Sequence, residues 1–240
     1  MKGIILAGGK GTRLHPLTKV TNKHLLPVGR EPMIYNPITR MTRAGITEIL
    51  VVTSTEHMGE IVNLLGSGKE FGCEFTYRVQ EEAKGIAHAL ALGEQFAGKE
   101  RVLVILGDNI TTADLGEHVR AFEKQERGAR ILLKKVADPE RYGIAAIDEK
   151  RIIQIEEKPE KPKSDYAVIG YYMYDGEVFD IIRGMKPSAR GEYEITAVNN
   201  AYVERGTLTY GVLEGPWTDA GTFESWQDAN RMLIGEDRER

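Results

Sequence analysis

The sequence contains one cysteine, Cys73, and no apolar run long enough to span a bilayer. A single cysteine excludes an intrachain disulfide and a cysteine metal cluster, and it suits a reducing compartment. The apolar stretch at the N-terminus is too short for the core of a secretion signal. The five histidines show no metal-ligand spacing, so a structural zinc site is not expected. These absences together predict a cytoplasmic protein without a membrane segment.

Charge of one sign is not in excess either. The 240 residues carry a formal net charge of −4, which gives no electrostatic reason to expect nucleic acid or an anionic membrane as a partner. The length suits one substantial α/β domain, although two small domains would also fit.

Three glycines follow the first apolar run of the chain. Residues 3–7 are apolar throughout and too short for a helix, which predicts a buried central strand. Gly8, Gly9 and Gly11 leave few side chains in the loop that follows, so backbone N–H groups can approach a phosphate. Arg13 adds a permanent cation whose fork geometry suits phosphate. A glycine turn that serves only chain geometry is the alternative.

Two familiar phosphate motifs are excluded by the spacing in this loop. The pattern G-x-x-x-x-G-K-[ST] fails because Lys10 is followed by Gly11, and G-x-G-x-x-G fails because Leu14 stands where the last glycine is required. A P-loop kinase and a nicotinamide oxidoreductase are therefore disfavoured.

Strands and helices alternate through the first half of the chain. Further strands are expected at residues 48–53, 74–79 and 101–106, with helices at 32–44, 61–65, 85–97 and 115–126. The alternation predicts an α/β fold, with a mainly parallel sheet between helices and ligands at the carboxyl ends of its strands. Shorter strands then predict a mixed or antiparallel extension, at residues 129–136, 144–147, 151–157, 167–174 and 208–212. Helices are expected at 176–183, 194–205 and from 222, before a frayed tail at 235–240.

Two aspartates follow apolar strands and lie close to a glycine, which precedes Asp108 and follows Asp219. Asp108 ends the sequence L-G-D at the exit of a central strand, and Asp219 lies in W-T-D-A-G-T at residues 217–222. Carboxylates in such places can hold Mg²⁺, which prefers hard oxygen ligands. For Asp108 viewed alone, a helix cap or turn aspartate is the alternative. Convergence of the two side chains would explain both positions.

The glycine loop belongs to a longer pattern. The residues Gly8-Gly9-Lys10-Gly11-Thr12-Arg13-Leu14-x-Pro16-Leu17-Thr18, followed by Lys23-x-Leu25-Leu26-Pro27, resemble the signature of the sugar-nucleotide pyrophosphorylases. The resemblance extends over about residues 2–233. It implies one nucleotidyltransferase domain over 1–240 with the Rossmann-like fold of nucleotide-diphospho-sugar transferases. A nucleotide part is expected at about 1–128 and a sugar-phosphate part at about 129–240.

The resemblance also implies catalytic roles. Arg13 and Lys23 would neutralise the reacting phosphates, and Asp108 and Asp219 would hold Mg²⁺. A sugar 1-phosphate would attack the α-phosphorus of a nucleoside triphosphate in line, so positioning and charge neutralisation would replace acid–base chemistry. The nucleotide would contact residues in and after the first strand and three later positions, namely Leu6, Ala7, Gly8, Gly9, Gly11, Thr12, Arg13, His24, Gln80 and Gly85.

Further segments resemble the acceptor side of the same family. They include P-E-R-Y-G at 139–143, E-E-K-P at 156–159 and R-G-E-x-E-I-T at 190–196. The residues implied to bind the sugar phosphate are Asn109, Tyr142, Gly143, Glu157, Lys158, Val168 and Arg190.

These segments and the spacing from Gln80 to Gly85 are similar to glucose-1-phosphate thymidylyltransferases, which implies dTTP and glucose 1-phosphate as substrates. His24 departs from the glutamine usual near the deoxyribose, and UTP or another sugar 1-phosphate remain alternatives. A non-catalytic regulatory module is an alternative of another class. The chain is expected to be a short form, because relatives continue with helices that contribute oligomer contacts and a regulatory site. A homo-oligomer remains open.

Overall fold

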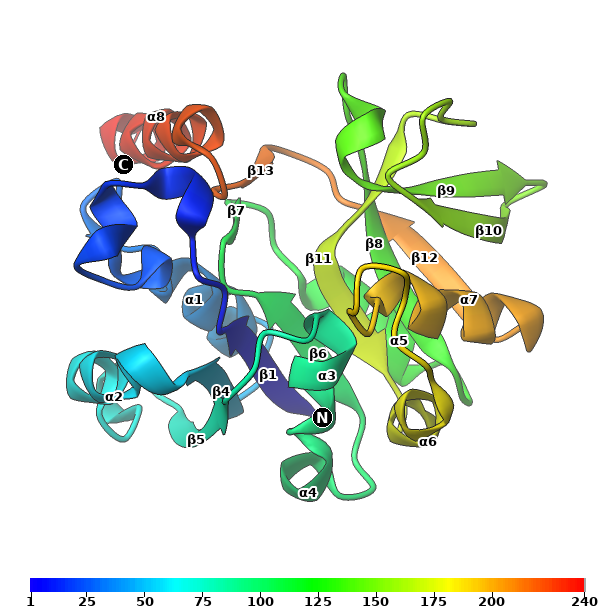
Figure 1. Ribbon diagram of the computed structural model, residues 1–240, viewed down its shortest axis with the longest axis horizontal. Coiled ribbons are helices and arrows are strands. Elements are labelled where there is room, and N and C mark those ends of the chain that lie inside the picture. The colour runs from blue at the N-terminus through cyan, green and yellow to red at the C-terminus, as the bar shows by residue number, and fades with distance from the viewer. Residues whose placement is uncertain (240) are drawn as a thin grey trace. The chain divides into compact units, whose positions relative to one another are not determined.

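Residues 1–239 are described by the computed structural model, with side chains described as far as residue 235. They form two compact units (Figure 1). The N-terminal unit combines residues 2–83, 105–116 and those from 215 onward, and the middle unit combines Met1 with residues 84–104 and 117–214. Neither unit is one continuous stretch, whereas the sequence prediction divided the nucleotide and acceptor parts at residue 128.

The N-terminal unit is built on a parallel sheet, as predicted. Strand β4 (Glu48–Ser54) pairs with β1 (Lys2–Ala7) on one side and with β5 (Glu74–Gln80) on the other. Strands β1 and β4 form because their middles are runs of apolar, mainly β-branched residues that are almost completely buried, whereas β5 alternates more polar and partly exposed residues with Phe75 and Val79. The register aligns Ala7 with Thr53 and Ser54 with Gln80, so the strand ends form one edge. The glycine loop begins at this edge.

Short elements complete the N-terminal unit. Its helices and remaining strands are β2 (Pro27–Val28), β3 (Glu31–Pro32), α1 (Tyr35–Arg43), α2 (Met58–Leu65), β7 (Asn109–Thr111), β13 (Trp217–Asp219) and α8 (Phe223–Glu239). Single 3-10 turns lie at Thr12–Leu14, Leu17–Lys19, Lys23–Leu25, Thr55–His57 and Lys69–Phe71.

The C-terminal segment returns to the N-terminal unit. Strand β13 pairs antiparallel with β7, which places Asp219 opposite Asn109. Helix α8, shown in red in Figure 1, buries Ala229 in a small core with Val28, Met33 and Ile110. The pairing and packing bring the segment that contains Asp219 next to the segment that contains Asp108, although the two are more than a hundred residues apart in the sequence.

The middle unit contains the predicted mixed sheet. Strand β11 (Tyr166–Tyr174) pairs antiparallel with β8 (Ala129–Lys135) and with β9 (Gly143–Asp148). Strand β9 also pairs antiparallel with β10 (Arg151–Glu157), while β12 (Leu208–Val212) pairs parallel with β8. The remaining elements of this unit are α3 (Ile86–Ala91), α4 (Glu94–Ala97), α5 (Gly116–Glu123), the 3-10 turn Pro139–Arg141, α6 (Glu177–Gly184) and α7 (Ile195–Glu204). Helix α5 begins at Gly116, the last residue of the segment 105–116 of the N-terminal unit. Strand β6 (Val102–Leu106) has its first three residues in the middle unit and its last two in the N-terminal unit.

Two details of the sequence prediction were wrong. The helix expected over 85–97 is two helices, because the N–H groups of Leu92 and Gly93 bond three residues back and Gly93 is a poor helix former. The tail expected to fray from residue 235 is helical through Glu239. Its glutamate and arginine residues favour a helix, and the preceding turn is held on the core by Leu233. Arg240 lies outside the described residues.

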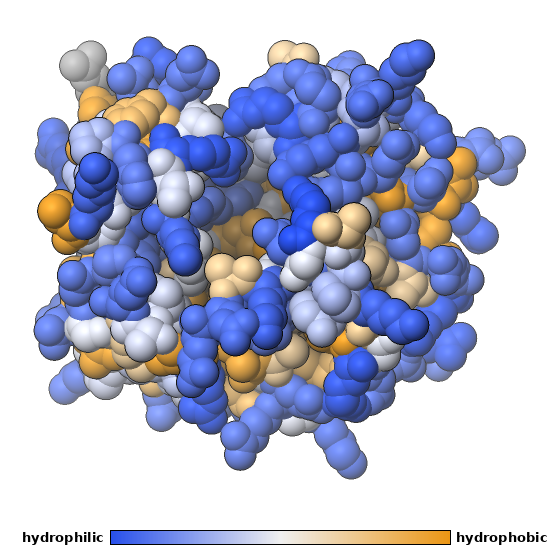
Figure 2. All heavy atoms as spheres, in the orientation of Figure 1, coloured by the Kyte–Doolittle hydropathy of each residue, from blue (hydrophilic) through white to orange (hydrophobic). Residues whose placement is uncertain are grey.

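The face seen in Figure 2 is mainly hydrophilic, and its apolar side chains lie in small, scattered groups. The large apolar side chains that are most exposed among the described residues are Val20 in a loop, Ile153 on a strand of the middle unit, and Phe223 and Ile234 on α8. In residues 1–239, no helix is both long enough and apolar enough to cross a membrane.

Candidate functional site

The glycine loop at the end of β1 is packed too closely for side chains at its first glycines. A Cβ atom on Gly8 would lie 3.0 Å from Gln80 Oε1, and one on Gly9 would lie 3.3 Å from Lys23 Cε. Gly11 has φ of +64°, and its carbonyl accepts a hydrogen bond from Thr18 Oγ1 at 2.7 Å. The loop therefore lies directly against two predicted site residues, Gln80 and Lys23.

Asp108 is held in the turn between β6 and β7. Lys23 Nζ donates to its Oδ2 atom, and Asn109 Nδ2 donates to its Oδ1 atom at 3.0 Å. The side chains of Lys23 and Asp108 are 12% and 15% exposed. Burial favours a raised pKa for Asp108, but the Lys23 charge and the two hydrogen bonds outweigh it and hold the pKa well below its usual range. Asp108 is therefore ionised at neutral pH.

The β7–β13 ladder brings the second aspartate motif to this turn. Ala220 donates its N–H to the Asp108 carbonyl at 2.8 Å, and Asp219 lies opposite Asn109. A Cβ atom on Gly221 would lie 2.9 Å from Arg13 Nη2 and 3.8 Å from Asp108 Oδ2. A glycine at position 221 is thus required for the close approach of Arg13. The predicted convergence of the two motifs is confirmed at the level of the backbone.

The donors in this turn fit a hard divalent cation. They are an ionised carboxylate, Asp108, and a second carboxylate, Asp219, placed beside it by strand pairing. Among the side chains described, those of residues 1–235, no group of three or more His, Cys, Asp or Glu forms a ready metal cage. Such a pair suits Mg²⁺, which binds through one or two carboxylates and takes its other ligands from phosphates and water.

His24 lies behind the site instead of on its surface. It is 1% exposed, its Nδ1 atom is 2.7 Å from Asn22 Oδ1, and its ring would contact any side chain at Gly107. Asn22 Nδ2 in turn donates to the Ala7 carbonyl at 3.4 Å. Burial and the neighbouring Lys23 charge lower the pKa of His24 to about 3. The ring is therefore neutral and supports both the end of β1 and the Asp108 turn.

The buried, neutral His24 predicts a loss of stability in acid. Its pKa is about 3 when folded and 6.5 when unfolded, so below pH 6.5 only the unfolded chain gains this proton. The free energy of unfolding should fall by about 2 kcal/mol from this residue between about pH 7 and about pH 5. Urea titrations of wild type and His24→Gln should show this difference as a steeper acid limb in the wild type. Parallel pH profiles would contradict the assignment.

The middle unit brings together most residues predicted to bind the sugar phosphate. Gly143 on β9 lies between Glu157 of β10 and Val168 of β11. A Cβ atom on Gly143 would lie 3.4 Å from Glu157 Oε2 and 3.4 Å from Thr196 Oγ1. Thr196, at the start of α7, donates to Glu157 Oε2 at 2.6 Å. An oriented, partly buried carboxylate thus lies beside the backbone of Gly143, an arrangement suited to hydroxyl groups.

Cations surround the same carboxylate. Arg190 Nη2 lies 3.5 Å from Glu157 Oε1 and 2.9 Å from Glu194 Oε1, while Lys158 Nζ lies 3.9 Å from Glu157 Oε1. Lys158 has φ of +47°, and its N–H donates to the Tyr142 carbonyl at 3.0 Å. Arg190 and Lys158 are half exposed, so both can reach an anion from solution.

Two predicted residues belong to a different unit from most members of the groups in which the sequence analysis placed them. Asn109, expected on the sugar phosphate, is 2% exposed beside Asp108 in the N-terminal unit, and its Oδ1 atom accepts from Trp217 Nε1 at 3.0 Å. Gly85, expected on the nucleotide base, belongs to the middle unit, where its φ of +96° allows close contact with the Tyr193 backbone.

Sequence reasoning missed several supporting residues. Asn22 and Thr196 lie inside or beside quoted motifs, but nothing in their spacing distinguishes a buried hydrogen-bonding role from a turn. Gly107 precedes Asp108, and Gly221 follows Asp219 by two residues. A glycine next to the end of a strand is a sequence signal for close packing, and it could have identified both positions.

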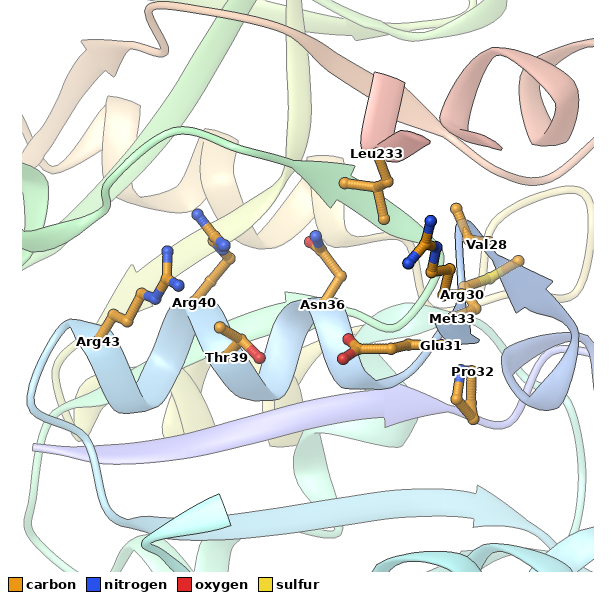
Figure 3. A pocket seen from close by; sticks show the side chains of 10 residues that line it. All are labelled: Val28, Arg30, Glu31, Pro32, Met33, Asn36, Thr39, Arg40, Arg43 and Leu233. Atoms are coloured by element: carbon orange, nitrogen blue, oxygen red, sulfur yellow. The ribbon is translucent and has the colours of Figure 1, made fainter. Parts of the chain in front are cut away.

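A separate cavity lies against α1 in the N-terminal unit (Figure 3). Its volume is about 490 Å³, and Arg40 and Arg43 of α1 line it with Arg30 and, from α8, Leu233. Arg40 Nη1 donates to the Thr112 carbonyl at 2.8 Å. The residues predicted to bind phosphate and metal do not line this cavity.

Comparisons with known proteins show the family to which this chain is similar. The model of the nucleotidyl transferase family matches residues 2–235. The chain is 44% identical to the glucose-1-phosphate thymidylyltransferase of Neisseria meningitidis over 95% of this chain and 81% of that protein. It is 47% identical to the enzyme of the same name from Mycolicibacterium smegmatis, over 97% of this chain and 82% of that protein.

Two solved structures share the fold of this chain. The chain superposes with a TM-score of 0.95 on a Bacillus anthracis protein crystallised with sucrose and described as a candidate glucose-1-phosphate thymidylyltransferase. The identity is 58% over 98% of this chain and 95% of that one. A UDP-glucose pyrophosphorylase in complex with UDP-glucose superposes with a TM-score of 0.87 at 26% identity, over 100% of this chain and 99% of that one.

Proposed function

This chain belongs to the nucleotidyl transferase family, and we propose that it joins dTTP and α-D-glucose 1-phosphate into dTDP-glucose with release of pyrophosphate. The observation that carries the proposal is that two groups of predicted site residues each come together within one unit. Arg13, Lys23, Asp108 and the Asp219 motif meet in one unit, and the Glu157 cluster forms in the other. The regulatory-module alternative is disfavoured, because a protein that only binds a nucleotide does not need both aspartates.

The N-terminal unit is proposed to hold the nucleotide. The backbone of Gly8, Gly9 and Gly11 offers N–H donors to a triphosphate, and Arg13 adds a bidentate cation. Gln80, which is 8% exposed and lies against Gly8, presents an amide to the base. That amide can accept from N3–H and donate to O4 of thymine.

The middle unit is proposed to hold glucose 1-phosphate. Glu157, oriented by Thr196, accepts hydrogen bonds from sugar hydroxyls, while Arg190 and Lys158 bind the phosphate. Tyr142, Gly143 and Val168 form the surface around the ring. The proposed substrates are polyanions, and Cys73 is the single cysteine of the sequence. Both features support a cytoplasmic location.

The reaction is proposed to be one direct displacement. A phosphate oxygen of glucose 1-phosphate attacks the α-phosphorus of dTTP, the bond to the bridging oxygen breaks, and pyrophosphate leaves with that electron pair. Arg13 stabilises the charge on the departing pyrophosphate, and Lys23 stabilises the α-phosphate. The nucleophile is already ionised at neutral pH, so neither a general base nor a covalent enzyme intermediate is needed.

Mg²⁺ is the proposed cofactor. Asp108 and Asp219 would hold it, and when bound it would neutralise and orient the phosphate oxygens. Asn109 and Trp217 position Asp108 through the hydrogen bonds described above.

A substrate panel tests the proposed specificity. Pyrophosphate release should be measured with dTTP, UTP, GTP, ATP and CTP, each against the 1-phosphates of glucose, galactose and mannose. The highest kcat/KM is expected for dTTP with glucose 1-phosphate. A maximum for UTP would instead support a uridylyltransferase, the second candidate, which the likeness to a UDP-glucose pyrophosphorylase favours. No release from folded protein would contradict the enzyme assignment.

Glu157→Gln is expected to act on the sugar phosphate only. The substitution replaces a charged acceptor by a neutral one, so the KM for glucose 1-phosphate should rise about tenfold while the KM for dTTP changes little. Steady-state kinetics with each substrate varied in turn measures both constants. Glu160→Gln, an exposed neighbour in the following loop, is the matched control. An equal change in both constants would remove Glu157 from the sugar site.

A further inference from the structure

We propose that Lys23 is a built-in counter-ion that competes with a divalent cation for Asp108 and leaves the carboxylate when nucleotide phosphates attract the ammonium group. This inference rests on the proposed function and adds to it a coupling between cation binding and nucleotide binding. It leads to an unusual expectation. Removing the positive charge of Lys23 should tighten cation binding in the nucleotide-free protein, although the same lysine serves the reaction.

Both oxygens of Asp108 already have a donor. Lys23 Nζ donates to Oδ2, and Asn109 Nδ2 donates to Oδ1 at 3.0 Å. Asn109 is fixed, because it is 2% exposed and its own Oδ1 atom accepts from Trp217 Nε1 at 3.0 Å. A cation that binds Asp108 through Oδ2 must therefore share that oxygen with the Lys23 ammonium group or displace it, and the four-carbon side chain of Lys23 is flexible.

The ammonium group of Lys23 also lies beside the glycine loop. A Cβ atom on Gly9 would be 3.3 Å from Lys23 Cε and 3.4 Å from Nζ, and one on Gly11 would be 3.0 Å from Lys23 Cβ. The side chain thus follows the loop that is proposed to bind the triphosphate and ends on Asp108. Rotation of the side chain alone can move the charge from the carboxylate toward a phosphate in the loop.

Charge sets the sign of the coupling. Two cations at one carboxylate repel each other, and water screens them weakly because the Lys23 and Asp108 side chains are only 12% and 15% exposed. A phosphate that draws Lys23 away therefore raises the affinity of Asp108 for the cation. By reciprocity, the cation raises the affinity for the nucleotide by the same factor.

The test uses Mn²⁺ as the probe and no substrate. Electron paramagnetic resonance of free Mn²⁺ gives its Kd for the nucleotide-free, full-length protein. Lys23→Met is expected to bind Mn²⁺ about tenfold more tightly than wild type, within the usual range for coupled sites. Lys23→Arg keeps the charge and should show no gain. Lys19→Met removes an exposed positive charge from a neighbouring turn and should also leave the Kd unchanged.

Two further measurements assign the effect to Asp108. The double variant K23M/D108N should lose the added affinity, and Mn²⁺ should raise the Tm of Lys23→Met more than that of wild type. Circular dichroism checks the fold of each variant. If Lys23→Met does not fold, Lys23→Gln decides, because it also removes the charge but keeps a donor for Asp108.

An Mn²⁺ Kd for the Lys23 variants equal to or weaker than that of wild type would overturn the proposal. So would an equal gain in K23M/D108N. Because the titration requires no turnover, the two proposals fail separately. An unchanged Kd in an enzyme that makes dTDP-glucose rejects the counter-ion alone. A tighter Kd in a protein without activity on the substrate panel supports the counter-ion and rejects the proposed function.

Discussion

Asp108→Asn is expected to lower kcat about a thousandfold or more while the fold is retained. The substitution removes the charge that holds the cation but keeps an oxygen that can accept from Lys23 Nζ and a side chain of the same size. The loss should appear in kcat more than in the KM for either substrate, because the cation acts on charge that develops in the transition state.

The measurement is steady-state pyrophosphate release at saturating Mg²⁺, with circular dichroism and Tm as checks on folding. Asp228→Asn, an exposed aspartate on α8 of the same unit that pairs with Arg231, is the matched control and should keep wild-type activity. Near-normal turnover in Asp108→Asn would remove this residue from the metal site and leave the aspartate as a structural partner of Lys23.

Arg13→Ala is expected to lower kcat about a hundredfold or more. Arg13 Nη2 comes within 2.9 Å of the position that a Cβ atom on Gly221 would occupy, so its guanidinium lies between the glycine loop and the Asp219 motif. A cation there can stabilise the departing pyrophosphate, a charge that is greatest in the transition state. The KM for glucose 1-phosphate should change little.

Kinetics with each substrate varied in turn separates these effects. Arg231→Ala, which removes an exposed arginine of α8, is the matched control. Gly221→Ala should reproduce part of the loss, since its new methyl group would displace the Arg13 guanidinium. An effect of Arg13→Ala confined to the KM of the sugar phosphate would reassign the residue to the acceptor.

The fold was predictable where one physical signal dominates. Apolar runs such as residues 3–7 and 48–53 predicted the parallel strands, because strands buried on both faces tolerate few polar side chains. The prediction of a single helix over 85–97 was wrong. The alanine-rich composition of this segment favours a single helix, and only the bonding around Gly93 shows the break.

For the candidate site, the sequence suggested the residue types but said less about their arrangement. The position of Asp219 beside Asp108 depends on β13 pairing with β7 across more than a hundred residues, which no local pattern encodes. Thr196 was missed because its role depends on the Glu157 carboxylate of another element, 2.6 Å away. His24 was expected on the nucleotide, and its burial behind the Asp108 turn makes a supporting role the more direct reading.

The most direct test of the proposed reaction is ³¹P nuclear magnetic resonance of the wild-type enzyme with Mg²⁺ and dTTP, before and after addition of glucose 1-phosphate. The proposed displacement predicts no change with dTTP alone. After addition, dTDP-glucose and pyrophosphate should appear in equal amounts, and Asp108→Asn should form neither at a comparable rate. Pyrophosphate or phosphate released without the sugar phosphate, or an unchanged spectrum from folded enzyme with both substrates, would contradict it.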